Sequence, residues 1–163
     1  MPAVIQRVSE AAVDAQDKRI ARIGHGLLVL LGVAKGDHEA DARRMVDKLV
    51  MLRIFADADG KMNRSLSDIG GQALIVSQFT LLGDTTKGRR PGFDDAAPPK
   101  VAEALYSQVV TGVRDRGIHV ETGSFGAHML VSLCNDGPVT FIVDTRETHM
   151  DSMPSGPENC DEP

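Results

Sequence analysis

The chain has 163 residues, of which 42% are hydrophobic and 25% charged, a composition typical of one soluble domain with a buried core. Its net charge of -5 argues against a generic basic protein that coats nucleic acid. No apolar run approaches the roughly 18 residues of a membrane span, and the first residues lack a secretory pattern. Two cysteines, Cys134 and Cys160, are too few for a disulfide framework, so we expect a cytoplasmic protein without a membrane partner.

The first half of the chain predicts strands and one helix. Alternating apolar residues, or a continuous apolar run in the third case, predict strands at 3–8 (continuing toward 15), 19–23, 26–33 and 54–55. Apolar side chains at spacings of three, four and seven between Ala42 and Leu52 predict an amphipathic helix of about four turns. Asp37 is the expected N-cap of this helix.

The second half adds a second helix and more strands. Further strands are predicted at 73–80, 119–122, 127–133 and 139–145, with irregular segments at 62–71 and 83–99. Pro98 or Pro99 is expected to open a helix that Gly117 closes. We therefore predict an α/β or α+β fold, with a mixed, largely antiparallel, barrel-like sheet and two main helices. The long segment 83–99 is a candidate for function because loops of that length seldom lack one.

The end of the chain differs from the rest in composition. Residues 146–163 show no periodicity and contain three prolines, one basic residue and five acidic residues. They contribute -4 to the net charge, which leaves about -1 on residues 1–145. The sequence thus predicts a folded domain at 1–145 and a disordered acidic tail at 146–163.

Residues 131–143 read as strand, turn, strand, with Asn135-Asp136-Gly137-Pro138 as the turn. The simple interpretation is the tip of a hairpin, because Gly137 permits a positive φ and Pro138 fixes its own φ. A second interpretation is that backbone carbonyls of this segment are held rigidly at the rim of a pocket. The pattern alone leaves both open.

Several side chains could serve chemistry near residues 77–90. Ser77 and Thr80 are candidate hydroxyls, but a nucleophile needs a positioned base, and no Gly-x-Ser-x-Gly elbow is present. Cys134 would need a histidine partner in space. The histidines lack ligand spacing, so we expect no metal. A serine-, threonine- or cysteine-dependent hydrolase and a non-catalytic RNA-binding module both stay open on these residues.

Six motifs resemble the D-aminoacyl-tRNA deacylase family in the family's order. They are IQRV from Ile5, GLLVLLGV from Gly26, SQFTL from Ser77, KGRRPGF from Lys87, the Phe-Gly-Ala that precedes Met129, and NDGPVT from Asn135. The resemblance covers residues 1 to about 145. It implies that 1–145 is a deacylase domain that hydrolyses the ester between a D-amino acid and the terminal ribose of tRNA. It also implies glycyl-tRNA as a second substrate and a homodimer with the active site at the subunit interface.

The resemblance also assigns roles to residues. Backbone groups near Phe79 and Thr80 would stabilise the oxyanion of the reaction. Ser77, Gln78, Met129, Gly137 and Pro138 would bind the aminoacyl end of the substrate, and Lys87, Arg89 and Arg90 would contact phosphates of the tRNA acceptor end. The Gly137–Pro138 peptide would be cis and would enter the partner's pocket, where Gly137→Ala would place a methyl group against the substrate without harming the fold. No cofactor and no DNA partner are expected.

Overall fold

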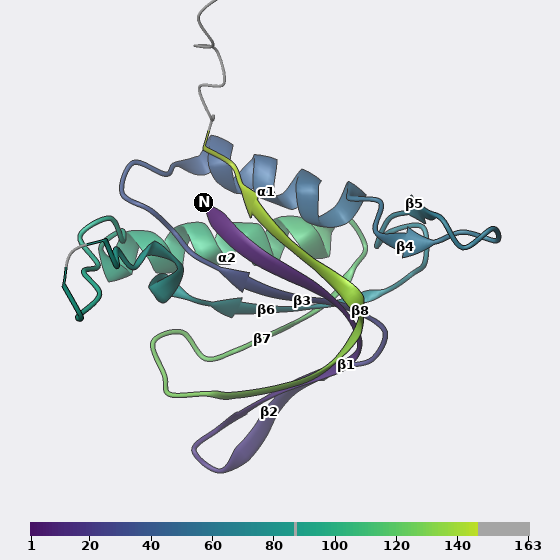
Figure 1. Ribbon diagram of the computed structural model, residues 1–163, viewed down its shortest axis with the longest axis horizontal. Helices are drawn as coiled ribbons and strands as arrows, with labels where there is room; N and C mark the ends of the chain where they lie inside the picture. Colours follow the sequence, from purple (N-terminus) through teal and green to yellow (C-terminus); the bar gives the residue numbers. More distant parts are fainter. Residues whose placement is uncertain (87, 147–163) are drawn as a thin grey trace, which may run out of the picture.

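The structure is a computed structural model that describes residues 1–86 and 88–146 (Figure 1). One sheet dominates the fold and contains six strands in the order β2-β1-β3-β6-β7, with β8 paired to β1. Its strands are β1 (Pro2–Ala15), β2 (Lys18–Ile23), β3 (Gly26–Leu31), β6 (Gln72–Ser77), β7 (His119–Thr122) and β8 (Leu130–Asp144). A separate two-stranded sheet consists of β4 (Phe55–Ala56) and β5 (Met62–Arg64).

The pairing directions confirm a mixed sheet. Strand β1 is antiparallel to β2, β3 and β8, whereas β3, β6 and β7 run parallel to one another. The sheet curls so strongly that β2 approaches β6 and β7, which gives the expected barrel-like shape (Figure 1). The interior of this curl holds a small apolar cluster that includes Val8, Ile23, Leu28 and Leu74.

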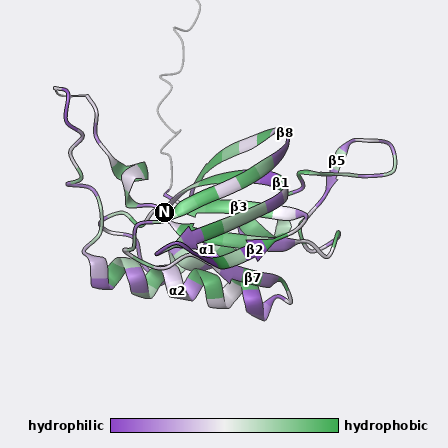
Figure 2. Cartoon of the chain, turned by 90° about the horizontal axis from the view of Figure 1, so that it is seen from below, coloured by the Kyte–Doolittle hydropathy of each residue, from purple (hydrophilic) through white to green (hydrophobic). Residues whose placement is uncertain are grey.

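Two helices cover the other face of the sheet, as predicted. They are α1 (Glu39–Met51) and α2 (Pro99–Asp115), which lie side by side in Figure 1 and pack on each other. Met45 and Leu49 of α1 and Val109 of α2 are fully buried in the main core, so each helix presents one apolar face to the sheet. In Figure 2, β3 is mostly green (hydrophobic), and green and purple (hydrophilic) segments alternate along α2.

The helix ends confirm one prediction and correct another. Pro99 opens α2, and Gly117, at φ +82°, follows its last turn as expected. The predicted N-cap of α1 was wrong, because His38 and not Asp37 occupies that position. The Asp37 side chain instead accepts a hydrogen bond from the backbone of Ala34 at 2.6 Å and so closes the turn before the helix.

The structure rules out one of the two interpretations of residues 135–138, the tip of a hairpin. Strand β8 runs without a reversal from Leu130 to Asp144 and pairs with β1 along most of its length. Val8 pairs with Asn135 and Gln6 pairs with Thr140, so residues 136–139 stand opposite the single residue Arg7. The segment is therefore a large bulge, and the turn residues that signal a hairpin serve equally well in a bulge.

Smaller differences concern strand ends. Strand β6 stops at Ser77, and Phe79–Leu82 form a short 3-10 helix where the sequence predicted a strand to residue 80. The segment 62–71, expected to be irregular, contains β5. The described part of the chain contains no helix long and apolar enough to cross a membrane. The predicted tail lies outside the described residues from residue 147 onward.

Candidate active site

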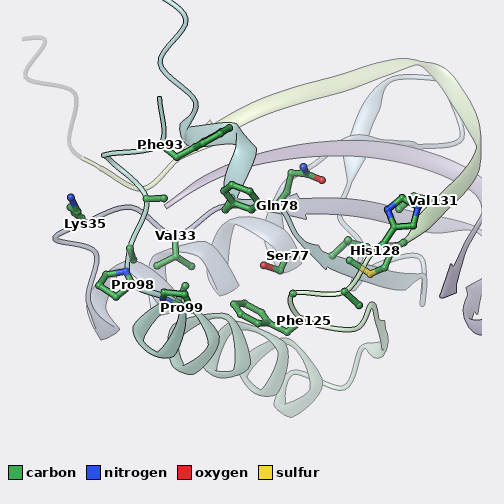
Figure 3. A pocket seen from close by; sticks show the side chains of 18 residues that line it. Val33, Lys35, Ser77, Gln78, Phe93, Pro98, Pro99, Phe125, His128 and Val131 are labelled. Carbon is green, nitrogen blue, oxygen red and sulfur yellow. The ribbon is translucent and has the colours of Figure 1, made fainter. Parts of the chain in front are cut away.

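A cleft of about 740 Å³ opens beside the end of β6 (Figure 3). Five parts of the chain meet there: the segment after β3, the end of β6, residues 93–97, the start of α2, and residues 125–131. The lining is mostly apolar, with a few polar groups of Lys35, Ser77, Gln78 and His128. A concave apolar site with few polar groups is the usual form of a site for small organic groups.

The floor of the cleft is the point where β6 gives way to the 3-10 helix. The backbone N–H of Gln78 donates to the carbonyl of Leu31 at 2.8 Å and so ties this bend to β3. The Gln78 side-chain amide donates to the Thr80 hydroxyl, which fixes both side chains. The N–H groups of Phe79 and Thr80 begin the 3-10 helix and have no backbone partner within the described residues, as expected for the first turn of a helix.

Aromatic rings form two sides of the cleft. Phe79 has 58% of its surface exposed and meets the ring of Phe93 edge-on, with 5.0 Å between ring centroids. Below them, Phe125 packs against Tyr106, whose hydroxyl donates to the carbonyl of Ile75 at 2.7 Å. Burial raises the pKa of Tyr106 to about 12, so its hydroxyl stays a donor at neutral pH and holds α2 to β6.

Met129 lines the cleft between His128 and Val131 of the same segment. Its sulfur accepts a hydrogen bond from the backbone N–H of Ser124 at 3.3 Å, and it lies close to Gly123. An added Cβ at Gly123 would lie 2.7 Å from this sulfur, so only glycine leaves room for the side chain in this position. Met129 is thus a fixed apolar wall.

The structure brings some predicted site residues together and separates others. Ser77, Gln78, Phe79 and Met129 line the cleft, whereas Thr80, the next residue of the 3-10 helix, is not among the lining residues. The cleft also includes Lys35, Phe93 and Phe125, which the sequence analysis did not single out. The three come from distant parts of the chain, and only the Phe-Gly-Ala and KGRRPGF motifs pointed toward two of them.

The basic loop lies beside the cleft and not within it. Asp84 and Gly92 exchange two backbone hydrogen bonds of 2.8 and 2.9 Å, which pin the base of the loop. Arg89 and Arg90 are exposed beyond this pair and do not line the cleft. Lys87 lies outside the described residues.

Gly137 and Pro138 do not line the cleft of their own chain. Their peptide bond is cis, as the resemblance implies. Arg7 holds the bulge from below: its guanidinium donates to the carbonyl of Asp136 at 2.9 Å and to the carbonyl of Ile54 at 2.7 Å. It also forms an ion pair with the Asp136 carboxylate at 3.0 Å, so the bulge has a fixed position on the sheet.

An added Cβ at Gly137 would collide with its own chain. It would lie 2.3 Å from Oδ1 of Asn135 and 2.7 Å from the backbone nitrogen of Val139. The expected result of Gly137→Ala, a block of substrate with an intact fold, therefore needs correction, because the methyl group would first disturb the bulge.

The remaining candidate, Cys134, does not line the cleft. Cys134 is exposed on β8 and borders a separate hollow beside Glu10 and Arg22. The residues that the structure describes include no group of three or more His, Cys, Asp or Glu side chains placed to hold a metal ion.

The sequence is similar to that of known proteins over most of its length. The sequence matches the family described as D-Tyr-tRNA(Tyr) deacylase over residues 4–144. A "D-aminoacyl-tRNA deacylase" of Desulfitobacterium hafniense (strain DSM 10664 / DCB-2) is 54% identical over 147 residues, which cover 90% of this chain and 99% of the relative. One of Anaeromyxobacter dehalogenans (strain 2CP-C) is 57% identical over 146 residues, which cover 90% and 98%.

Solved structures share the fold. A structure described as "c-Myc DNA Unwinding Element Binding Protein" superposes with a TM-score of 0.83 at 38% identity, and the match covers 88% of this chain and 98% of that one. A "probable eukaryotic D-amino acid tRNA deacylase" superposes with a TM-score of 0.77 at 22% identity and the same coverage, a likeness of fold alone. The chain belongs to the D-Tyr-tRNA(Tyr) deacylase family.

Proposed function

We propose that this protein hydrolyses the ester bond of D-aminoacyl-tRNA, and of glycyl-tRNA, as a proofreading enzyme of translation in the cytoplasm. The observation that carries the proposal is the position of the Ser77–Thr80 motif. Ser77, Gln78 and Phe79 of this motif line a preformed cleft in a chain that matches the deacylase family over residues 4–144. Residues 1–145 form the catalytic domain in this proposal.

The reaction needs little acid–base catalysis from side chains, because an aminoacyl ester is already activated. Water attacks the carbonyl carbon, the bond to the ribose oxygen breaks, and that oxygen leaves with a proton, assisted by the neighbouring 2′-hydroxyl of the substrate. The N–H groups of Phe79 and Thr80 stabilise the negative charge that develops on the carbonyl oxygen. Their free position at the start of the 3-10 helix supports this role.

Ser77, Gln78 and Met129 bind the aminoacyl end of the substrate in this proposal. All three line the cleft, and the Gln78–Thr80 hydrogen bond keeps the floor rigid. Lys87, Arg89 and Arg90 contact phosphates of the acceptor end, for which the exposed position of Arg89 and Arg90 beside the cleft is suited.

The protein acts as a homodimer in this proposal, and two observations support it. Strand β8 pairs only with β1 among the described strands, and it exposes apolar side chains, with Leu130 at 63% and Ile142 at 84%. An exposed apolar edge strand is the kind of surface that a partner covers. In addition, Gly137 and Pro138 lie outside the cleft of their own chain, so they reach a substrate only if they enter the cleft of a second copy.

The deciding experiment compares matched D- and L-tyrosyl-tRNA. The protein should release D-tyrosine and spare the L form. Equal rates on both forms would refute the proposal, and binding without release would indicate a non-catalytic RNA-binding module. Light scattering on the same sample should give the mass of a dimer, whereas an active monomer would exclude a site shared between subunits.

A further inference from the structure

The cleft has an uneven distribution of charge. Lys35 is the single lysine or arginine among its eighteen lining residues, and no aspartate or glutamate belongs to the lining. Figure 3 places Lys35 at one end, His128 and Val131 at the other, and Ser77 between them. A single uncompensated cation at one end of an apolar cleft attracts an anionic part of a ligand to that end.

The backbone around Lys35 is firmly held. Its N–H donates to the carbonyl of Asp95 at 2.8 Å, and the N–H of Ala97 donates to the carbonyl of Val33 at 3.0 Å. These bonds pair residues 33–35 with 95–97 at the rim of the cleft. The Lys35 side chain is exposed and makes no ion pair with a residue that the structure describes. The Lys35 side chain therefore extends from a firmly held backbone, and its ammonium group is available to a ligand.

The two ends of the proposed substrate differ in charge, and this decides its orientation. The aminoacyl group carries a cationic α-amino group, which Lys35 repels. The nucleotide carries a phosphodiester on its 5′ side, one negative charge per nucleotide of the strand. We propose that Lys35 binds the phosphodiester that joins the last two nucleotides of the tRNA, and so directs the aminoacyl group toward Met129. This inference rests on the proposed function and specifies how its substrate lies.

A second hollow continues from Lys35 away from the cleft. It has a volume of about 420 Å³, and Lys35 lines both cavities. Two arginines also line this hollow, but each forms an ion pair with a carboxylate: Arg44 with Asp41 at 2.7 Å and Arg146 with Asp144 at 2.6 Å. Among the lysines and arginines that line the two cavities, Lys35 is therefore the one that forms no ion pair with a residue that the structure describes.

The test uses Lys35→Ala with two substrates. One is D-tyrosyl-tRNA, and the other is the D-tyrosyl ester of adenosine, which has no phosphate. We expect the KM for the tRNA to rise roughly tenfold at an unchanged kcat, the effect of losing one ionic hydrogen bond to phosphate. The rate on the phosphate-free ester should not change. The slope of log KM against log salt concentration should fall by about 0.7, the value for one phosphate contact on a single strand.

Two variants serve as controls. Lys35→Arg should keep the contact, and Lys48→Ala removes an equal charge from an exposed position of α1 that does not line the cleft. An equal loss of activity on both substrates would indicate a structural effect and would overturn the inference. An unchanged KM for the tRNA would also overturn it.

A binding measurement separates this inference from the proposed function. RNA that ends in CCA and carries no amino acid should bind Lys35→Ala roughly tenfold more weakly than the wild type. Equal affinity would overturn the inference whether or not the wild type hydrolyses either ester. If the wild type hydrolyses neither ester, the proposed function fails, and the affinity for this RNA still decides the role of Lys35.

Discussion

Replacing Gly137 by alanine should damage the bulge of β8 itself, and this makes it a demanding test of the site. The new Cβ would lie 2.3 Å from Oδ1 of Asn135, where ordinary contacts begin at 3.4 Å. The Asn135 amide is not free to move, because its nitrogen donates to the carbonyl of Arg7 at 2.9 Å and to that of Val139 at 3.2 Å. Relief of the collision therefore breaks hydrogen bonds that define the bulge.

The magnitude follows from these contacts. Each of the two hydrogen bonds contributes about 1 kcal/mol, and the second collision, 2.7 Å from the backbone nitrogen of Val139, requires a backbone shift. We expect Gly137→Ala to lower the free energy of unfolding by about 2–4 kcal/mol. Hydrolysis of D-tyrosyl-tRNA should fall by about a hundredfold, or 2.7 kcal/mol of barrier, because in the proposed dimer the carbonyls of the bulge would leave the partner's cleft.

Urea denaturation and deacylation rates measure these two effects separately. Gly24→Ala is a matched control, since its Cβ would meet nothing closer than Oε1 of Gln72 at 3.8 Å and should change neither quantity. In an Asn135→Ala background, Gly137→Ala should cost less stability by about 1 kcal/mol, because one collision partner is gone. Wild-type stability and activity in Gly137→Ala would refute the reasoning.

Two further predictions concern a buried carboxylate and a thiol. Burial alone would raise the pKa of Asp41, but hydrogen bonds from Arg44 and from the N-cap residue outweigh it and hold this pKa well below its usual value. Ionised Asp41 thus stabilises the fold above about pH 4 and loses this effect as the pH falls further. Asp41→Asn should unfold with about 3 kcal/mol less free energy at pH 7, and urea melts should show the difference shrinking below about pH 4. A difference independent of pH, or one matched by the exposed Asp94→Asn, would contradict this account. Cys134→Ala, thiol alkylation and chelators should leave most deacylation intact, and a hundredfold loss would return the chemistry to Cys134 or to a metal.

The sequence predicted most of the fold because local patterns determined most of its elements. The apolar face of α1, from Ala42 to Leu49, repeats at helical spacing and is buried as expected. The uninterrupted apolar run in β3 required a strand covered on both faces, and the structure buries it between the helices and the inside of the curl. Pro99 and Gly117 mark the ends of α2 by their backbone preferences.

The errors occurred where pairing over long distances decided the local structure. Residues 135–138 contain the turn chemistry of a hairpin, yet β1 pairs with β8 on both sides of them, so the chain continues in one direction. Arg7 contributes to this outcome from the far end of the sequence, since its guanidinium binds the bulge. No local pattern contains that contact.

The site was predictable only in part, because some of its residues share a local motif and others are brought together by pairing over long distances. Ser77 and Gln78 lie within one motif, so a resemblance found them together, and the structure places both in the cleft. Lys35 follows the central strand without a distinctive pattern, and it joins the cleft only because residues 33–35 pair with 95–97. A residue placed by such pairing has no signature in its own neighbourhood.

The chemistry of the proposed reaction explains why the cleft holds so few reactive side chains. An enzyme that cleaves an activated ester gains more from position and selectivity than from a strong base. Selectivity against one enantiomer requires rigid groups where the wrong side chain would project, and backbone held by Arg7 and Asn135 is more rigid than a free side chain. A single chain places that rigid segment away from its own cleft, so the same need for selectivity explains why two copies would be required for a complete site.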